Sequence, residues 1–395
     1  MKKVFLVAAC LLIASSIVRA QATKLPRAFI DKQLRLAASQ YKVLMEQLPD
    51  PVFPRSYDAA TRQLTTSNSS WWCSGFYPGT LLYLYSYTQD DVLKAEAIEK
   101  LALLEKEQFN TRTHDLGFMM YCSFGNAFRL WQDEKYKPVL LNSARSLATR
   151  FTPTTGVIRS WDFGDWKYPV IIDNMMNLEL LTWSATQSND SSLKQIAVAH
   201  ANTTLKNHFR ADYSSYHLVD YDPQTGQALK KQTVQGAADS SAWARGQGWA
   251  LYGYTAMFRE TGLPQYREQA RHIARFILQH PRLPADKIPY WDFDAPGIPG
   301  ALRDASSAAV IASALIELAR YVSKKERKEF RSAAARMLRS LSSPVYHSQP
   351  GENAGFILKH SAGNVPVHSE MDAPLTYADY YYIEALLRYK DEFLQ

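Results

Sequence analysis

The stretch Trp243-Ala244-Arg245-Gly246-Gln247-Gly248-Trp249 gathers aromatic, charged and glycine residues at the start of a predicted helix. Five other stretches have a similar aromatic, acidic and glycine-rich composition, and each lies at or just ahead of a predicted helix. They are Trp-Trp-Cys-Ser-Gly-Phe (71–76), His-Asp-Leu-Gly-Phe (114–118), Ile-Asp-Asn-Met-Met-Asn (172–177), Trp-Asp-Phe-Asp (291–294) with Arg303-Asp304, and Tyr-Ala-Asp-Tyr-Tyr-Tyr (377–382). Because the unusual residues recur at one structural position, we expect a ring of helices that carries its functional loops at one end.

Apolar residues recur every three or four positions through most of the chain, which is the period of an amphipathic helix. The pattern is clear in Ala308, Ile311, Leu315 and Leu318. No linker rich in Pro, Ser or Gly and no block of like charge divides the chain. The pattern predicts twelve helices, over 28–48, 74–89, 92–108, 115–132, 135–150, 173–187, 190–209, 241–260, 264–279, 303–322, 326–342 and 374–389.

The predicted loops alternate in length. Even-numbered helices follow long loops, whereas odd-numbered helices from the third onward follow short turns such as 89–91 and 261–263. A short connection makes two helices antiparallel neighbours. Six such hairpins predict an all-α fold, an (α/α)6 barrel with the even-numbered helices inside and the long loops on one rim. Turn residues predict minor strands in the rim loops 210–240 and 280–294.

Residues 1–20 resemble a signal peptide for export. Lys2 and Lys3 precede an apolar run from Val4 to Val18, and small residues at 18–20 suit cleavage after Ala20. The apolar run is too short for a membrane anchor. We therefore expect an exported protein without membrane attachment, periplasmic in a bacterium, with residues 21–395 forming one catalytic domain. We also expect a monomer.

The charge balance argues against a nucleic-acid partner. The formal charge is +7, and removal of Lys2, Lys3 and Arg19 leaves +4 (7 − 3 = 4), with the charges interspersed. Nucleic-acid binding usually needs a clustered basic face, whereas a modest positive excess suits a small anionic substrate.

The cysteines and histidines predict neither a disulfide framework nor a metal site. Cys73 and Cys122 alone remain in the mature chain, and we interpret them as free buried thiols. No His/Cys spacing resembles a zinc site. We expect no metal and no cofactor.

Asp115 and Asp173 are the leading candidates for acid/base catalysis. Each begins an inner helix beside aromatic residues or methionines. Apolar surroundings raise the pKa of a carboxyl group, and a helix N-terminus lowers it. The alternative is that each Asp only caps its helix, since Asp is a preferred N-cap. Two such residues on the same rim favour catalysis.

Aromatic residues in the same clusters predict stacking platforms for sugar rings, although core packing is the alternative for each one. Arg245 lies between two tryptophans, where it could clamp a carboxylate or pair with Asp239 or Asp304. His217 and Gln235 are further hydrogen-bonding candidates. The aromatic candidates are Trp71, Trp72, Trp243, Trp249, Trp291 and Phe293.

Several long motifs resemble those of the unsaturated glucuronyl hydrolases of glycoside hydrolase family 88. The resemblance runs in unbroken order from about residue 70 to residue 389. It includes the segments 114–118, 171–178, 214–226, 243–249, 289–294, 303–309 and 377–387.

This resemblance implies an (α/α)6 barrel that removes a 4,5-unsaturated uronic acid from the non-reducing end of fragments made by polysaccharide lyases, with glycosaminoglycan fragments favoured. It implies that Asp173 protonates C4 of the double bond and then helps water to add at C5, with Asp115 as the second essential carboxylate. The substrate-binding positions that we expect are Trp72, His114, His217, Thr233, Gln235, Arg245, Trp249 and Ser361.

Three other functions remain open. An unsaturated rhamnogalacturonyl hydrolase shares the barrel and the alkene chemistry but acts on pectin fragments, and His114-Asp115 before Leu-Gly-Phe argues against it. An α/α-barrel polysaccharide lyase would create a double bond rather than consume one, and the tyrosine-rich segment 377–382 is compatible with that chemistry. An exported sugar-binding protein would need neither Asp115 nor Asp173.

Overall fold

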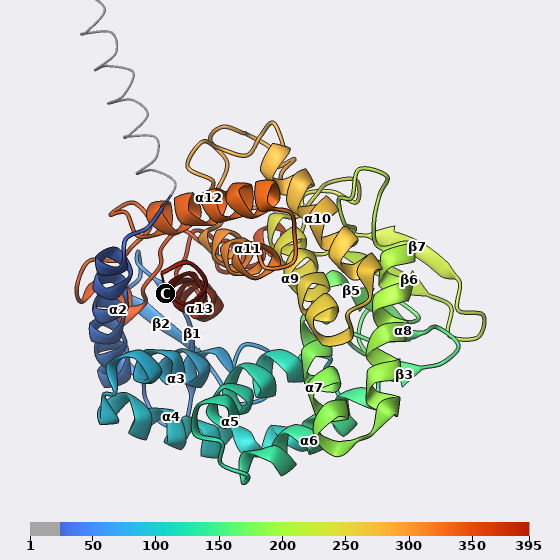
Figure 1. The fold of residues 1–395 in the computed structure, drawn as a ribbon, viewed down its shortest axis with the longest axis horizontal. Helices are drawn as coiled ribbons and strands as arrows, with labels where there is room; N and C mark the ends of the chain where they lie inside the picture. The colour runs from blue at the N-terminus through green and yellow to red at the C-terminus, as the bar shows by residue number, and fades with distance from the viewer. Residues whose placement is uncertain (1–23, 395) are drawn as a thin grey trace, which may run out of the picture.

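The computed structural model describes residues 24–394, so the predicted signal peptide at 1–20 lies outside the described residues. Two concentric rings of helices surround a common axis (Figure 1). The inner ring consists of α3 (Phe76–Thr88), η2 (Gly117–Gly125) with α5 (Asn126–Trp131), η3 (Ile172–Asn177) with α7 (Leu178–Ser188), α9 (Ala244–Thr261), α11 (Ala305–Leu318) and α13 (Thr376–Phe393). The outer ring consists of α2 (Arg27–Gln47), α4 (Asp91–Leu104) with η1 (Glu105–Phe109), α6 (Tyr136–Ala148), α8 (Ser191–Asn207), α10 (Pro264–Gln279) and α12 (Lys324–Leu341).

Each of the twelve predicted helices has a counterpart within residues 24–394. Inner helices pack against their inner neighbours, as α11 does against α9 and α13, and the packing of α13 on α3 closes the ring. The fold is therefore an (α/α)6 barrel, which confirms the prediction. No helix among the described residues is long and apolar enough to cross a membrane.

The two rings differ in how many sides of each helix are buried. Every residue of α11 is buried, and its many Ala and Ser residues allow its neighbours to approach closely. By contrast, α12 buries a single face, formed by Phe330, Ala334, Leu338 and Leu341 with a few neighbours, and exposes Lys and Arg on the other. An apolar stripe on an otherwise charged helix is typical of a surface helix, so the hydrophobic pattern assigns α11 to the inner ring and α12 to the outer ring.

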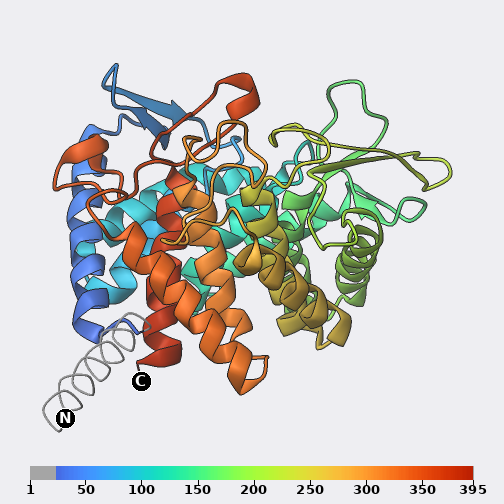
Figure 2. The ribbon, with the colours of Figure 1, turned by 90° about the horizontal axis from the view of Figure 1, so that it is seen from above.

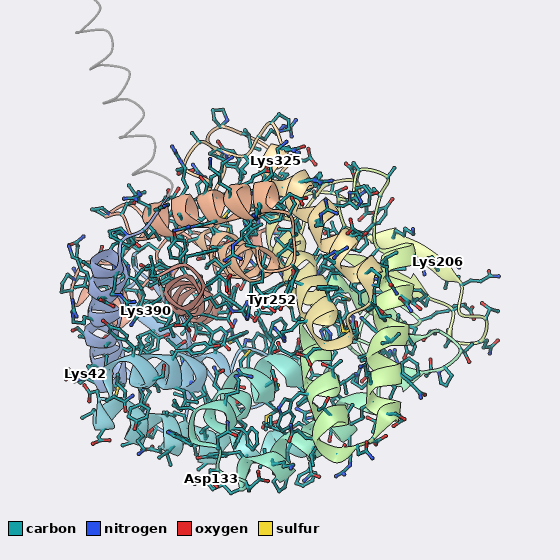
Figure 3. All side chains as sticks on the ribbon, viewed as in Figure 1. Lys42, Asp133, Lys206, Tyr252, Lys325 and Lys390 are labelled. Atoms are coloured by element: carbon teal, nitrogen blue, oxygen red, sulfur yellow. The ribbon has the colours of Figure 1, made fainter. Side chains whose placement is uncertain are left out.

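The short turns between inner and outer helices follow a common pattern. Gln89, Gln132, Asn189 and Gly262 each end an inner helix in the left-handed conformation, which reverses the chain within a few residues. With every inner helix running in the same direction, their N-termini and the long loops share one rim. Figure 2 shows these loops at one end of the barrel and the C-terminus at the other. At the axis, Tyr252 lies inside the ring, whereas Lys206 and Lys325 lie at its edge (Figure 3).

Short strands decorate the rim. β5 (Pro169–Ile171), β6 (Leu218–Tyr221) and β7 (Ala228–Gln232) form an antiparallel sheet, which confirms the strands predicted in 210–240. The strands predicted in 280–294 are wrong, because that loop makes only the isolated bridges Trp243–Asp292 and Tyr290–Arg303. The prediction missed three further strand pairings in the rim loops. They are β1 (Phe53–Asp58) with β2 (Gln63–Ser67), β3 (Phe151–Thr152) with β4 (Val157–Ile158), and β5 with β6.

Two inner helices begin with irregular turns that contact each other. The predicted α-helix 115–132 starts as the π-helix η2, and the predicted helix 173–187 starts as the 3-10 helix η3. The backbone N–H of Phe118 donates to Oδ1 of Asn177 at 3.1 Å. A Cβ atom on Gly117 would lie 2.4 Å from the Cα of Asn177, so only glycine permits this approach. The contact holds the segments that carry Asp115 and Asp173 beside each other.

We expect Gly117→Ala to destabilise the protein, because the new methyl group would push the two turns apart. Overpacking of this kind typically costs about 1–3 kcal/mol of unfolding free energy. Gly300→Ala in the rim loop is the matched control, since its Cβ would meet nothing closer than 3.4 Å. Urea denaturation of both variants measures the difference, and equal unfolding free energies would contradict this packing.

Candidate active site

A cavity of about 500 Å3 opens on the rim of the barrel. Eight parts of the chain line it: β1, residues 70–72 before α3, the loop before η2, the loop before η3, the β6–β7 region, the start of α9, the segment 363–370 and the start of α13. Asp115 and Asp173 both line this cavity, together with His114, His217 and Arg245. The cavity therefore brings together chemically active residues that are far apart in the sequence.

Asp173 lies deep in the cavity wall, with only 8% of its surface exposed. Its Oδ2 atom has no hydrogen-bond partner among the described residues, and the nearest basic atom is Nε2 of His217 at 3.7 Å. Burial raises the pKa of Asp173 to about 7, although the positive charge of Arg245 opposes the shift. At neutral pH this carboxyl group is therefore divided between its protonated and ionised forms, as a group that must both give and take a proton requires.

His217 presents a neutral N–H group to Asp173. Its Nδ1 accepts hydrogen bonds from the backbone N–H groups of Val234 at 2.9 Å and Gln235 at 3.4 Å. Because Nδ1 is an acceptor, the proton of the neutral ring is on Nε2, the atom that faces Asp173. Burial lowers the pKa of His217 to about 3, so the ring stays uncharged and can donate a hydrogen bond without competing for the proton of Asp173.

Asp115 sits at the cavity surface in a network of donors. Its carboxylate accepts a hydrogen bond from Oγ1 of Thr113 at 2.6 Å and lies 3.2 Å from Nε2 of His114. Nδ1 of His114 lies 3.4 Å from Oγ of Ser160, and burial lowers the pKa of His114. These contacts fix the orientation of the Asp115 carboxylate.

Neither catalytic candidate caps its helix. No side chain accepts a capping hydrogen bond at the start of η2 or of η3. The alternative interpretation of Asp115 and Asp173 as N-caps is therefore wrong, and their positions need another explanation.

Arg245 lines the cavity, but most of its N–H groups donate hydrogen bonds to other residues of the protein. It donates to Gln235 Oε1 at 3.2 Å, to Gly363 O at 2.6 Å and to Ala362 O, and it pairs with the buried Asp304 at 3.4 Å. Its guanidinium group also stacks on Trp243 at 4.4 Å from the ring centroid. The predicted pairing with Asp304 is thus confirmed, whereas the predicted clamping of a substrate carboxylate stays a prediction.

The other predicted substrate contacts divide into two groups. Trp72 and Gln235 line the cavity, as does Trp71. Three others, Thr233, Trp249 and Ser361, lie outside the cavity wall itself, and their contacts with the substrate stay predictions. Thr233 holds the turn before α9 by accepting from Gly236 N, Trp249 is fully buried between Phe118 and Tyr381, and Ser361 is fully buried beside Ala373.

Trp243, Trp291 and Phe293 are also buried rather than available as sugar platforms. Trp243 packs on His217 and Arg245, and Phe293 packs on Phe276 and His280. In these positions the alternative of core packing is correct.

Two parts of the cavity wall were not predicted from the sequence. One is the segment with Trp161, Phe163 and Trp166, which has the same aromatic, acidic and glycine-rich composition as the six selected clusters and could have been found by that signal. The other is the ion pair between Arg55 and Glu370, whose members lie 315 positions apart. No local signal in the sequence connects these two residues.

Among residues 24–394 no group of three or more His, Cys, Asp or Glu side chains is arranged to hold a metal ion. Cys73 and Cys122 are both free thiols. Burial raises the pKa of Cys122 to about 12 and that of Cys73 further, so neither is a reactive thiolate at neutral pH.

Comparisons with known proteins agree with this geometry. Residues 47–353 match the profile described as Glycosyl Hydrolase Family 88. An unsaturated glucuronyl hydrolase from Formosa agariphila is 46% identical over 85% of this chain and 84% of its own length, and one from Bacillus sp. (strain GL1) is 34% identical over 85% and 90%. The crystal structure of an unsaturated glucuronyl hydrolase specific for heparin superimposes with a TM-score of 0.90 at 46% identity, covering 93% of this chain and 98% of that one.

We expect Asp173→Asn to become increasingly stable relative to the wild type as pH rises from about 4 to above 7. The pKa of Asp173 is raised from 3.8 to about 7 by folding, so the stability it contributes is present below 3.8 and is lost as pH rises through 7. A shift of this size corresponds to at most about 4 kcal/mol. Because burial raises the pKa of Asp379 to about 7 as well, the difference between variant and wild type is the quantity to measure, by thermal unfolding across that pH range. A difference that does not change with pH would contradict the raised pKa.

Proposed function

The chain belongs to glycoside hydrolase family 88 and is an unsaturated glucuronyl hydrolase, and we propose that Asp173 is its general acid and base. One observation carries this assignment: Asp173 faces the cavity with a buried, unpartnered carboxyl oxygen and a pKa near neutrality. A general acid works best when its pKa lies close to the working pH. No other acidic side chain of the cavity wall combines these properties.

The first step that we propose is proton transfer from Asp173 to C4 of the unsaturated uronate. The electron pair of the C4=C5 double bond forms the new C–H bond, which leaves a positive charge shared by C5 and the ring oxygen. The ionised Asp173 carboxylate then lies beside this charge. The positive charge of Arg245, which favours the ionised form of Asp173, helps the proton to leave.

The second step is the addition of one water molecule at C5. Asp173, now a carboxylate, takes a proton from the water as its oxygen bonds to C5, and the product is a hemiketal. The hemiketal opens to a ketone at C5, and the hemiacetal left at C1 then releases the attached sugar. No glycosyl–enzyme bond forms in this route, so the rule that relates carboxyl separation to stereochemical outcome does not apply.

Asp115 and the two histidines have supporting roles in this scheme. The Asp115 carboxylate is held by Thr113 and His114, and we assign it to orienting the sugar hydroxyl groups and stabilising the developing positive charge. The neutral N–H of His217 lies near Oδ2 of Asp173, where it can hold the carboxylate after the proton has left. A charged imidazolium there would bind the carboxylate more tightly and make it a weaker base.

The substrate class that we propose is the unsaturated fragments of glycosaminoglycans. The named activities of the relatives, which include heparin and chondroitin substrates, support it. The wall of the cavity contains four tryptophans together with Arg55, Arg112 and Arg245, a combination that suits a sugar acid. The pectin-fragment alternative and the lyase alternative are not favoured, because the relatives share neither of those activities.

We expect Asp173→Asn to abolish turnover while leaving substrate binding nearly intact. The amide keeps the shape of the side chain but cannot transfer a proton, and a positioned acid/base group contributes roughly 10²–10⁴-fold to the rate. The reaction is followed by the loss of ultraviolet absorbance of the alkene, and binding is measured by calorimetry. Retention of more than about a tenth of the wild-type rate would place the proton donor elsewhere.

The same absorbance assay separates the three classes of function. On a panel of lyase-generated disaccharides the absorbance falls for a hydrolase, whereas on intact polysaccharide it rises for a lyase. A pure binding protein changes neither. The fragment that is consumed fastest identifies the preferred glycosaminoglycan.

We expect kcat/KM to fall above about pH 7, where Asp173 loses its proton, and we expect this fall to move to higher pH in Arg245→Gln. The charge of Arg245 lowers the pKa of Asp173, so its removal raises that pKa. Arg282→Gln is the control, because Arg282 is half-exposed and pairs with Asp294 outside the cavity. A shift of the falling limb to lower pH in Arg245→Gln would show that Arg245 does not act on Asp173 through its charge.

A further inference from the structure

One buried serine hydroxyl joins the two segments that carry the proposed catalytic residues. Ser160 lies in the cavity wall with only 1% of its surface exposed. Its Oγ lies 3.4 Å from Nδ1 of His114, which precedes Asp115 in the chain. The same Oγ accepts a hydrogen bond at 3.0 Å from the backbone N–H of Ile171, just ahead of Asp173. The reaction steps proposed for Asp173 assign no role to this hydroxyl group.

The backbone around Ser160 is fixed by hydrogen bonds of its own. The N–H of Ser160 donates to the carbonyl oxygen of Pro169 at 2.8 Å. Nearby, the side-chain amide of Asn174 donates to the carbonyl oxygen of Ile158 at 2.7 Å. The position of the Ser160 hydroxyl group is therefore set by the fold rather than by a bound substrate.

The hydroxyl group of Ser160 is fully satisfied only when it donates to His114. Because Oγ already accepts from the N–H of Ile171, its own proton needs an acceptor, and among the described residues Nδ1 of His114 is the one within hydrogen-bond distance. A proton on Nδ1 would leave the buried O–H group without a partner, which is costly. The proton of a neutral His114 ring therefore belongs on Nε2.

The contact on the other side of the ring also favours a proton on Nε2. Nε2 of His114 lies 3.2 Å from Oδ1 of Asp115. With its proton on Nε2 the ring donates to this carboxylate, whereas with its proton on Nδ1 the lone pair of Nε2 would face a negatively charged oxygen. Burial lowers the pKa of His114, so the ring carries a single proton. Asn174 also interacts with the ring, and its Oδ1 has no partner among the described residues, so it competes for that proton.

We propose that Ser160 is a positioning residue, which holds His114 in the Nε2–H tautomer so that the ring donates a hydrogen bond to Asp115. This proposal rests on the proposed function, in which the Asp115 carboxylate orients the sugar and stabilises the developing positive charge. In the other tautomer Asp115 would lose the donor on Oδ1 and keep only the hydrogen bond from Thr113. Its carboxylate would then turn away from the lone pair of His114.

The tautomer is measured directly by nitrogen NMR of the enzyme labelled with isotope-enriched histidine. The His114 signals are assigned from their absence in His114→Gln. In the wild type, Nδ1 is expected to show the chemical shift of an unprotonated ring nitrogen and Nε2 that of a protonated one. In Ser160→Ala the form protonated on Nδ1 is expected to appear, because that nitrogen has lost its donor. This measurement needs no turnover.

The kinetic effect of the tautomer is measured in the same variant. We expect Ser160→Ala to lower kcat roughly fivefold or more, which corresponds to one lost hydrogen bond, and to change KM less than about twofold, because the charge on the substrate develops only during the reaction. In a His114→Gln background the same substitution is expected to have little further effect, since the two residues act through one contact.

Ser143→Ala is the matched control. Ser143 is fully buried in α6 and donates from Oγ to the carbonyl oxygen of Val139 at 2.7 Å, far in the sequence from both catalytic segments. Its substitution is expected to leave kcat and the His114 signals unchanged. Thermal unfolding of Ser143→Ala and Ser160→Ala measures the loss of stability that each missing hydroxyl group causes.

Three outcomes would overturn the proposal. The first is a proton on Nδ1 of His114 in the wild type, a result that needs no variant to fold. The second is an unchanged set of His114 signals in Ser160→Ala, which would leave Ser160 only its structural bond to Ile171. The third is an additive loss of kcat in the double variant. Failure of the proposed function looks different, since the wild type would then not consume the unsaturated disaccharide although His114 kept its proton on Nε2.

Discussion

The burial of the Asp173 carboxyl group is the constraint on which the site depends. A carboxyl group with a solvated environment would be ionised at neutral pH and could not protonate a carbon atom. Here the wall of the barrel removes water from Asp173, and this burial raises its pKa to about 7. The contact between Gly117 and Asn177 keeps η2 and η3 close enough to maintain that burial. The ring of helices therefore determines the pKa of Asp173 as well as its position.

The positive charge of Arg245 limits how far burial raises the pKa of Asp173. A fully buried cation needs compensating partners, and Arg245 finds them in Asp304, Gln235 and the carbonyl groups of residues 362 and 363. These contacts connect α9, α11 and the segment 361–363, so the charge that moderates Asp173 also joins three parts of the rim. The contacts that stabilise the rim and the charge that lowers the pKa of Asp173 therefore belong to the same side chain.

The fold and the two carboxylates could be predicted from the sequence because each depends on local information. Short segments of sequence are enough to predict helical periodicity and loop length, and Asp115 and Asp173 lie at the starts of helices. A short segment does not predict whether an aromatic residue is exposed. Trp249 and Trp71 occur in similar clusters, yet one is buried beneath the site and the other is exposed at its mouth. The Arg55–Glu370 pair depends on the closure of the ring, which brings residues 315 positions apart into contact.

A direct titration of the Asp173 carboxyl group tests whether this residue can be the proton donor. Infrared difference spectra of the wild type and Asp173→Asn, recorded across a range of pH, isolate the C=O stretch of the protonated acid at this one position. The band is expected to persist through mildly acidic pH and to disappear with a midpoint near 7, the pKa that burial imposes on Asp173. A midpoint near the ordinary value of 3.8 would show that Asp173 is ionised at neutral pH and would contradict its role as the proton donor.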